Sequence, residues 1–251
     1  MAKLMPEPPP ELSIHEFEDV DLRGATVIDG FPSVGLVSTI TANYLIDVLD
    51  LKQIGIMDSE HFPTVSIVRN AVPMYPVRIY AGSGVCIFIS EFQPAPKLIR
   101  PIAQAIMDFA RRKGCTTIIS PEGLVVEGDN EGDVKVYALG STPVTREHLQ
   151  KKGLTLFANG IITGVSGVLL NLGKKLDFNA ISILAEANPN YPDARAAAKV
   201  IEVIDALLED VTIDVKPLYT EAENIERTLR MMQKQAATGE QKREFQPPMY
   251  G

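Results

Sequence analysis

Hydrophobic residues follow two periodicities along the chain, and together these predict alternating strands and helices. Short continuous apolar runs predict buried strands, while apolar residues repeated every three or four positions predict amphipathic helices. The runs predicted as strands are 27–28, 54–57, 65–68, 77–80, 85–89, 116–119, 124–126, 134–138 and 181–185. The segments predicted as helices are 34–49, 96–113, 145–152, 160–172, 193–208 and 221–235. This alternation favours an α/β domain with a mixed, largely parallel sheet.

Two hairpins are expected to make the sheet mixed. The strands 77–80 and 85–89 are separated by a Gly-Ser-Gly turn, which is typical of a β-hairpin. The runs 124–126 and 134–138 predict a second hairpin with an acidic tip at 127–133. That tip superficially resembles a calcium loop, but the EF-hand pattern places a Glu six residues after its Gly, and the sequence has Ala there. We therefore interpret it as a hairpin tip and expect no metal site.

The composition excludes several classes of partner. The chain of 251 residues is 45% hydrophobic, so it can bury a large core, and its net charge is −8. Aromatic residues make up only 6% and Trp is absent, so nucleic acid and anionic membranes are poor candidate partners. Cys86 and Cys115 lie in apolar strand-like surroundings and are expected to be buried free thiols of a cytoplasmic protein.

The turn after the first strand is the most conspicuous candidate for chemistry. Gly30 and Gly35 have the spacing of the phosphate-binding pattern G-x-x-x-x-G-K-[ST], and Ser33 is a candidate N-cap for the following helix. Leu36 and Val37 stand where the pattern needs Lys and Ser or Thr. The residues that would contact phosphate and Mg²⁺ are absent, so we interpret the segment as a structural turn without a cofactor.

A second candidate is a serine between glycines. Ser166 lies in Gly-Val-Ser-Gly, which departs from the nucleophile elbow G-x-S-x-G because residue 168 is Val. A catalytic serine also needs a histidine base. His15, His61 and His148 are the only histidines, and none has a recognisable setting, so we expect no catalysis at Ser166.

Four segments, at 30–35, 120–123, 164–167 and 186–193, occur in a fixed order along the chain. In this order they resemble archaeal members of the proteasome assembly chaperone family, and the resemblance covers roughly residues 15–210. It implies a three-layer α/β/α sandwich similar to the nucleoside phosphorylase core, without that enzyme's chemistry. It also implies a homo-oligomer that meets the α subunits of the core proteasome without consuming ATP, and hence no enzyme, no cofactor and no metal.

The C-terminal residues sharpen this expectation. Met249-Tyr250-Gly251 fits the hydrophobic–Tyr–any-residue ending of proteasome activators, whose carboxylate and Tyr enter pockets between neighbouring α subunits. We therefore expect a lead-in at 1–14, a chaperone-family domain at 15–216, a helix at 217–237 and a proteasome-binding tail at 238–251. Met249, Tyr250 and Gly251 are the predicted proteasome-binding residues.

Two alternatives stay open at this point. The same fold could carry an enzyme of nucleoside hydrolase or phosphorylase type, which would need carboxylate, His or Arg groups converging on a pocket. The chain could also be a scaffold that binds another member of the chaperone family rather than the proteasome. Convergence of distant residues is not visible in a sequence, so the first alternative depends on the fold.

Overall fold

A nine-stranded sheet forms the centre of the computed structural model, which describes residues 12–125, 134–208 and 211–220. Its strand order is β1-β3-β6-β7-β2-β8-β11-β9-β10. These strands are β1 (Ser13–Glu16), β2 (Thr26–Gly30), β3 (Lys52–Asp58), β6 (Val77–Gly82), β7 (Val85–Ser90), β8 (Thr117–Val125), β9 (Val136–Gly140), β10 (Thr155–Leu156) and β11 (Asn179–Ala187). A separate hairpin consists of β4 (Ile67–Arg69) and β5 (Val72–Met74).

The middle of the sheet is parallel and its flanks are mainly antiparallel. β7, β2, β8 and β11 pair in parallel, whereas β6 pairs antiparallel to β7, and β9 pairs antiparallel to β11. β7 is buried along its whole length, which matches its continuous apolar run, because strands covered on both faces need no polar side. This arrangement confirms the predicted mixed α/β fold.

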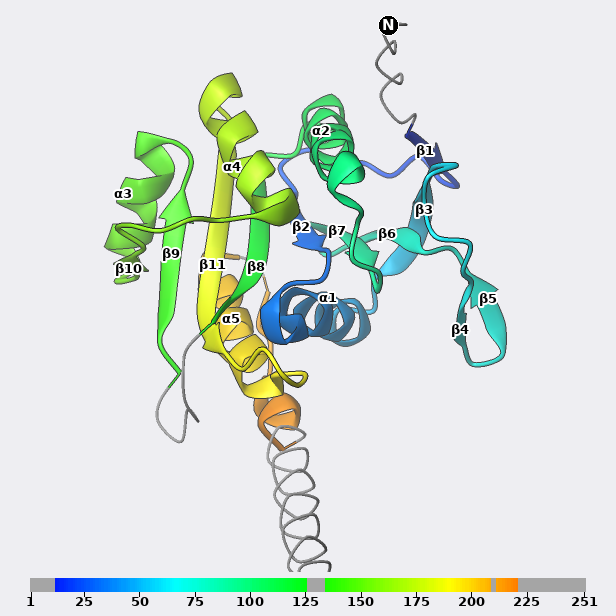
Figure 1. Ribbon diagram of the computed structural model, residues 1–251. Helices are drawn as coiled ribbons and strands as arrows, with labels where there is room; N and C mark the ends of the chain where they lie inside the picture. Colours follow the sequence, from blue (N-terminus) through cyan, green and yellow to red (C-terminus); the bar gives the residue numbers. More distant parts are fainter. Residues whose placement is uncertain (1–11, 126–133, 209–210, 221–251) are drawn as a thin grey trace, which may run out of the picture.

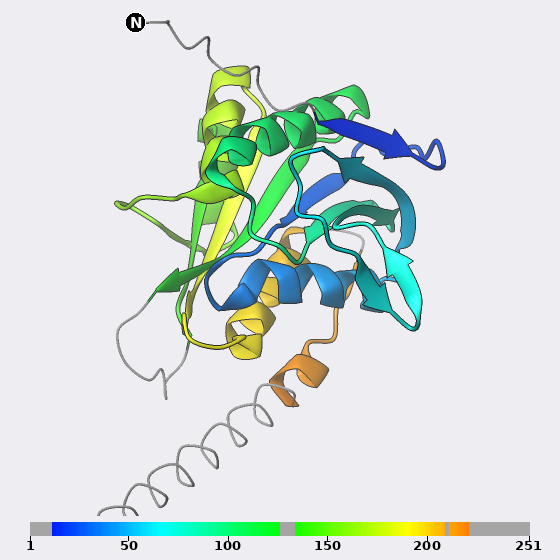
Figure 2. The same cartoon turned by 45° about the vertical axis from the view of Figure 1, so that its right-hand side comes forward.

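Helices cover both faces of the sheet and complete a three-layer sandwich (Figures 1 and 2). The helices are α1 (Val37–Val48), α2 (Pro96–Arg112), α3 (Pro143–Lys151), α4 (Gly164–Leu176) and α5 (Ala194–Leu207), and α1 follows the 3₁₀ turn η1 (Val34–Leu36). One core cluster packs α1 and α5 against the sheet, and the other packs α2 and α4 against its opposite face. α3 packs at the β9–β10 edge.

The predicted hairpins have opposite outcomes. The first is confirmed, because β6 and β7 pair antiparallel across a turn in which Gly84 has φ +72°. The second is wrong, because β11 lies between β8 and β9 and pairs with both. The two runs are close in sequence and each is apolar, but the more distant β11 offers β8 a parallel partner along all nine of its residues.

The segment after α5 packs back onto the body. Ile213 and Leu218 are buried in the core cluster that contains α1 and α5. The Tyr44 hydroxyl donates to the Asp214 carbonyl oxygen, and the Tyr219 hydroxyl donates to Glu202 Oε1 over 2.7 Å. The predicted helix at 221–235 and the acidic tip at 127–133 lie outside the described residues. Within the described part of the chain, no helix is long and apolar enough to cross a membrane.

Candidate functional site

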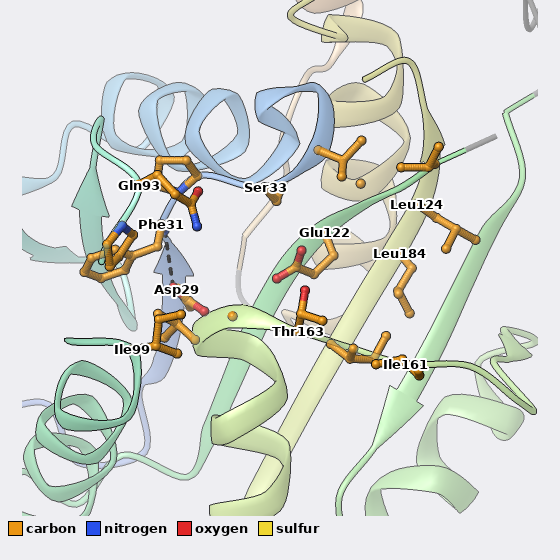
Figure 3. Close-up of a pocket in the computed structure, with 18 residues that line it drawn as sticks. Asp29, Phe31, Ser33, Gln93, Ile99, Glu122, Leu124, Ile161, Thr163 and Leu184 are labelled. Atoms are coloured by element: carbon orange, nitrogen blue, oxygen red, sulfur yellow. Dashed lines mark hydrogen bonds between the residues drawn. The ribbon is translucent and has the colours of Figure 1, made fainter. Parts of the chain in front are cut away.

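A cavity of about 510 Å³ lies at the carboxyl ends of the parallel strands (Figure 3). Residues from β2, β8 and β11 form its floor, and the loops before α1, α2 and α4 form its walls. β2 and β7 are neighbours in the sheet, but the helix after β2 (α1) and the helix after β7 (α2) cover opposite faces. The two connections therefore separate at this point of the sheet. Open α/β sheets place ligand sites at such a switch point.

Unequal strand lengths create the opening. β2 pairs with β8 only from Thr26 to Ile28 and ends at Gly30, whereas β8 continues to Val125 along β11. On the side where β2 has ended, this segment of β8 therefore faces the cavity, while its other side stays paired with β11. η1 packs directly on this segment, because a Cβ atom at Gly123 would lie 2.1 Å from the Val34 carbonyl oxygen. Glycine at this position is required by that close approach.

The turn leading into α1 is locked to the loop that precedes α5. Gly35 has φ +62°, and its carbonyl oxygen accepts a hydrogen bond from the Asp193 N–H over 2.8 Å. The Asp193 side chain in turn caps α5 by accepting from the Ala196 N–H over 2.9 Å. The sequence predicted Ser33 as an N-cap, but its side chain makes no capping hydrogen bond to the first turn of η1. Its hydroxyl oxygen instead accepts a hydrogen bond from the Ser38 N–H over 3.2 Å.

Asp29 is the most deeply buried acidic residue of the cavity, with only 3% of its surface exposed. Its Oδ2 accepts a hydrogen bond from the Ser120 hydroxyl over 3.0 Å, and its Oδ1 accepts from the Phe31 N–H over 3.3 Å. Burial raises the pKa of Asp29 to about 6, because the charged form loses its hydration and these two hydrogen bonds restore only part of it. Near neutral pH this carboxyl group can therefore both hold and release a proton.

Glu122 is the second acidic group of the cavity. Burial, and secondarily the charge of Asp29, raise the pKa of Glu122 well above its usual value, while a hydrogen bond from Ser166 opposes this shift. The side chain is partly exposed and lines the cavity. Figure 3 shows its carboxyl group beside Thr163, with Asp29 on the adjacent strand. Two carboxyl groups from neighbouring strands thus share one cavity and disfavour each other's charge.

The described residues do not assemble a nucleophilic or metal site here. Ser166 is buried at the start of α4, where its Oγ lies 3.3 Å from Ser182 Oγ on β11. The described residues that line the cavity include no histidine, and Ser166 itself is not among them. The described residues also contain no group of three His, Cys, Asp or Glu side chains that could hold a metal ion.

Sequence reasoning missed both carboxyl groups, although it found the segments that carry them. Asp29 directly precedes the first of the four family segments, and Glu122 lies within the second. The available signal was a single acidic residue within an otherwise apolar run, as in Val-Ile-Asp-Gly. The predicted site residues Met249, Tyr250 and Gly251 lie outside the described residues, so their role remains a prediction.

Comparisons with known proteins agree with the fold. The model of the PAC2 family matches residues 27–233. A crystal structure of Pyrococcus furiosus PbaA, described as an archaeal homolog of proteasome-assembly chaperone, has a TM-score of 0.83 at 32% identity, covering 94% of this chain and 97% of that one. Pyrococcus furiosus PbaB, described as an archaeal proteasome activator, has a TM-score of 0.79 at 26% identity, covering 89% and 99%. An uncharacterized Methanocaldococcus jannaschii protein, MJ0106, is 28% identical over 231 residues, covering 92% and 94%.

Proposed function

Because the chain belongs to the PAC2 family, we propose that it is an ATP-independent assembly chaperone or activator of the core proteasome. The observation that carries the proposal is the likeness, over almost the whole chain, to both PbaA and PbaB. These two proteins are described as a homolog of a proteasome-assembly chaperone and as a proteasome activator, respectively. We further propose that the protein acts in the cytoplasm as a homo-oligomer.

The C-terminal residues are the proposed contact with the α ring. Tyr250 can bury its ring in a pocket while its hydroxyl group keeps a hydrogen bond, and the Gly251 carboxylate can pair with a lysine. Pro247 and Pro248 restrict the approach to an extended conformation, which lowers the entropy lost on docking. Several such tails on one oligomer would together bind the proteasome more tightly than a single tail does, which is avidity.

The body offers a firm base for this segment. The chain last described at Thr220 is fixed to α1 and α5 by the buried Ile213 and Leu218, and by the hydrogen bond from Tyr219 to Glu202. A segment that leaves the body from a fixed point samples a smaller volume, which raises its effective concentration at a nearby partner. This anchoring supports a contact that is made beyond residue 220.

The β4–β5 hairpin supports the proposed self-association. It stands apart from the main sheet (Figure 1), and Val68 and Val72 are 66% and 57% exposed. The pairing of Arg69 with Val72 places these two valines on opposite faces of the hairpin, since successive residues alternate. A two-stranded hairpin with exposed apolar residues on both faces gains stability when a neighbouring subunit covers it.

The test is binding of tail variants to immobilised core proteasome. Tyr250→Ala should lose on the order of 2 kcal/mol of binding free energy per site, which is about 30-fold in affinity, as expected for an aromatic hot spot. Binding through several tails should multiply this loss of affinity. Tyr250→Phe should bind more tightly than Tyr250→Ala, and residues appended after Gly251 should weaken binding as much as Tyr250→Ala does. Phe17→Ala is the matched control, because Phe17 is an exposed aromatic residue of the body outside the β4–β5 hairpin.

Equal binding by the wild type and Tyr250→Ala would contradict the proposed contact. Capture of another PAC2 protein in place of the proteasome would favour the scaffold alternative. Hydrolysis of a fluorogenic peptide by mature core proteasome then separates an activator, which accelerates hydrolysis, from an assembly chaperone, which accelerates ring formation from α subunits.

A further inference from the structure

The cavity at the carboxyl ends of the strands has the size and composition of a small-molecule site. Its volume of about 510 Å³ lies within the range typical of such sites, roughly 300–1,000 Å³. Most of its described lining is apolar, and this part includes Phe31, Ile99, Ile161 and Val165. Asp29, Glu122 and Thr163 lie where β2 and β8 meet the start of α4, and the other polar side chains, Ser33 and Gln93, come from the loops before α1 and α2. An apolar wall with a small polar group set at one end is the usual design of a ligand pocket.

The charge of the cavity is one-sided. Asp29 and Glu122 are the titratable side chains among its described lining residues, which include no Lys, Arg or His. Glu91, in the neighbouring loop before α2, is paired with Arg78 through its Oε1 at 2.5 Å and does not line the cavity. The acidic pair of the cavity thus has hydrogen-bond donors around it but no compensating cation within the described lining.

This arrangement selects among classes of ligand. An anion such as phosphate is disfavoured, because each carboxylate repels it in a space where water screens poorly. A neutral ligand can donate hydrogen bonds to the carboxylates or accept them from protonated carboxyl groups, but these bonds lack the added attraction of opposite charges. A cation with several N–H groups satisfies both carboxylates, and planar amidinium or guanidinium groups do so with two parallel hydrogen bonds.

We propose that this cavity binds a small organic cation, with an amidinium, guanidinium or ammonium group at Asp29 and Glu122 and an apolar body against Ile99, Ile161 and Val165. The carboxyl groups give the ligand its orientation, and the apolar wall gives it burial. The site is separate from the proposed tail contact with the proteasome and does not depend on it. Cation binding lowers the pKa of both carboxyl groups and therefore releases protons into the solvent.

The experiment titrates the full-length protein with two cations and their neutral isosteres by calorimetry. The pairs are benzamidine with benzamide, and phenylguanidine with phenylurea. Each cation should bind at least about tenfold more tightly than its isostere, the discrimination expected of one charge-assisted bidentate contact. At about pH 6, binding should release a fraction of a proton, seen as an observed heat that changes with the ionisation enthalpy of the buffer.

Three variants locate the site. Glu122→Gln and Asp29→Asn should each weaken cation binding about tenfold and reduce the proton release, since each removes one carboxylate. Glu186→Gln is the matched control, because Glu186 is a partly exposed carboxylate on β11 that does not line the cavity, and it should bind like the wild type.

Measurements on the wild type alone keep the proposal testable if a variant fails to fold. The proposal is wrong if neither cation binds more tightly than its isostere, or if binding releases no protons. It is also wrong if folded Glu122→Gln and Asp29→Asn bind the cations as the Glu186→Gln control does.

Discussion

Replacing Asp29 with Asn should stabilise the protein progressively as the pH rises. Burial raises the pKa of Asp29 from 3.8 to about 6, so between these two pH values the folded state holds a proton that the unfolded state has lost. Each pKa unit corresponds to about 1.4 kcal/mol, so at neutral pH ionisation costs the fold about 3 kcal/mol. The stability that comes from the proton on Asp29 is therefore fully present below the unfolded pKa and is lost as the pH rises through the folded pKa.

The free-energy cost of ionising Asp29 in the folded protein increases with pH. With these two pKa values the cost is about 1 kcal/mol at about pH 4.5 and about 3 kcal/mol at about pH 7.5. Asn keeps an acceptor for the Phe31 N–H and offers the Ser120 hydroxyl a donor instead of an acceptor. Any cost of this exchange is the same at both pH values, so the stability gap between variant and wild type should widen by about 2 kcal/mol between them.

The assay is urea unfolding of both proteins at one fixed protein concentration, because an oligomer's stability depends on concentration. Asp108→Asn serves as the control, since it removes a carboxylate from an exposed position on α2. A stability gap between Asp29→Asn and the wild type that stays constant, or that narrows as the pH rises, would refute the inference that burial raises the pKa of Asp29.

Three further outcomes are expected. A chain ending at Thr220 keeps the buried Leu218 and should still self-associate by light scattering; a monomer at micromolar concentration would contradict self-association through the body. Gly123→Ala should destabilise the protein by about 1–3 kcal/mol in urea unfolding, because the new Cβ overlaps the Val34 carbonyl oxygen; an unchanged midpoint would show that η1 can move aside. Cys86 is fully buried and burial raises its pKa, so a disulfide reagent should modify it only as fast as the protein unfolds, and rapid labelling of the folded protein would exclude this.

Local patterns were sufficient to predict most of the fold. The apolar periodicity predicts a helix at 96–113, and α2 spans Pro96–Arg112. The same patterns missed β1 and β10, because β1 has the mostly polar sequence Ser-Ile-His-Glu and β10 has only two residues. Such edge strands owe their existence to pairing with a longer neighbour, and this information is absent from their own sequence.

The cavity could not be predicted for a related reason. Asp29 and Glu122 are 93 positions apart, and they meet only because β2 and β8 are neighbours in the sheet. The search for catalytic groups relied on short motifs, and a pair of acidic residues on two strands forms none. By contrast, the C-terminal residues form a contiguous motif, so their role can be predicted from the sequence alone.

The cavity and residues 211–220, which precede the proposed proteasome contact, lie on different parts of the body. Asp29 and Glu122 project from the sheet toward α4, since Glu122 contacts Ser166 there. Residues 211–220 pack on the opposite face, against α1 and α5. Distant sites that do not contact each other are expected to act additively. The double variant of Glu122→Gln and Tyr250→Ala should therefore lose cation binding and proteasome binding by the same factors as the single variants. A departure from additivity greater than about 0.5 kcal/mol would instead show that ligand occupancy of the cavity is coupled to the proteasome contact.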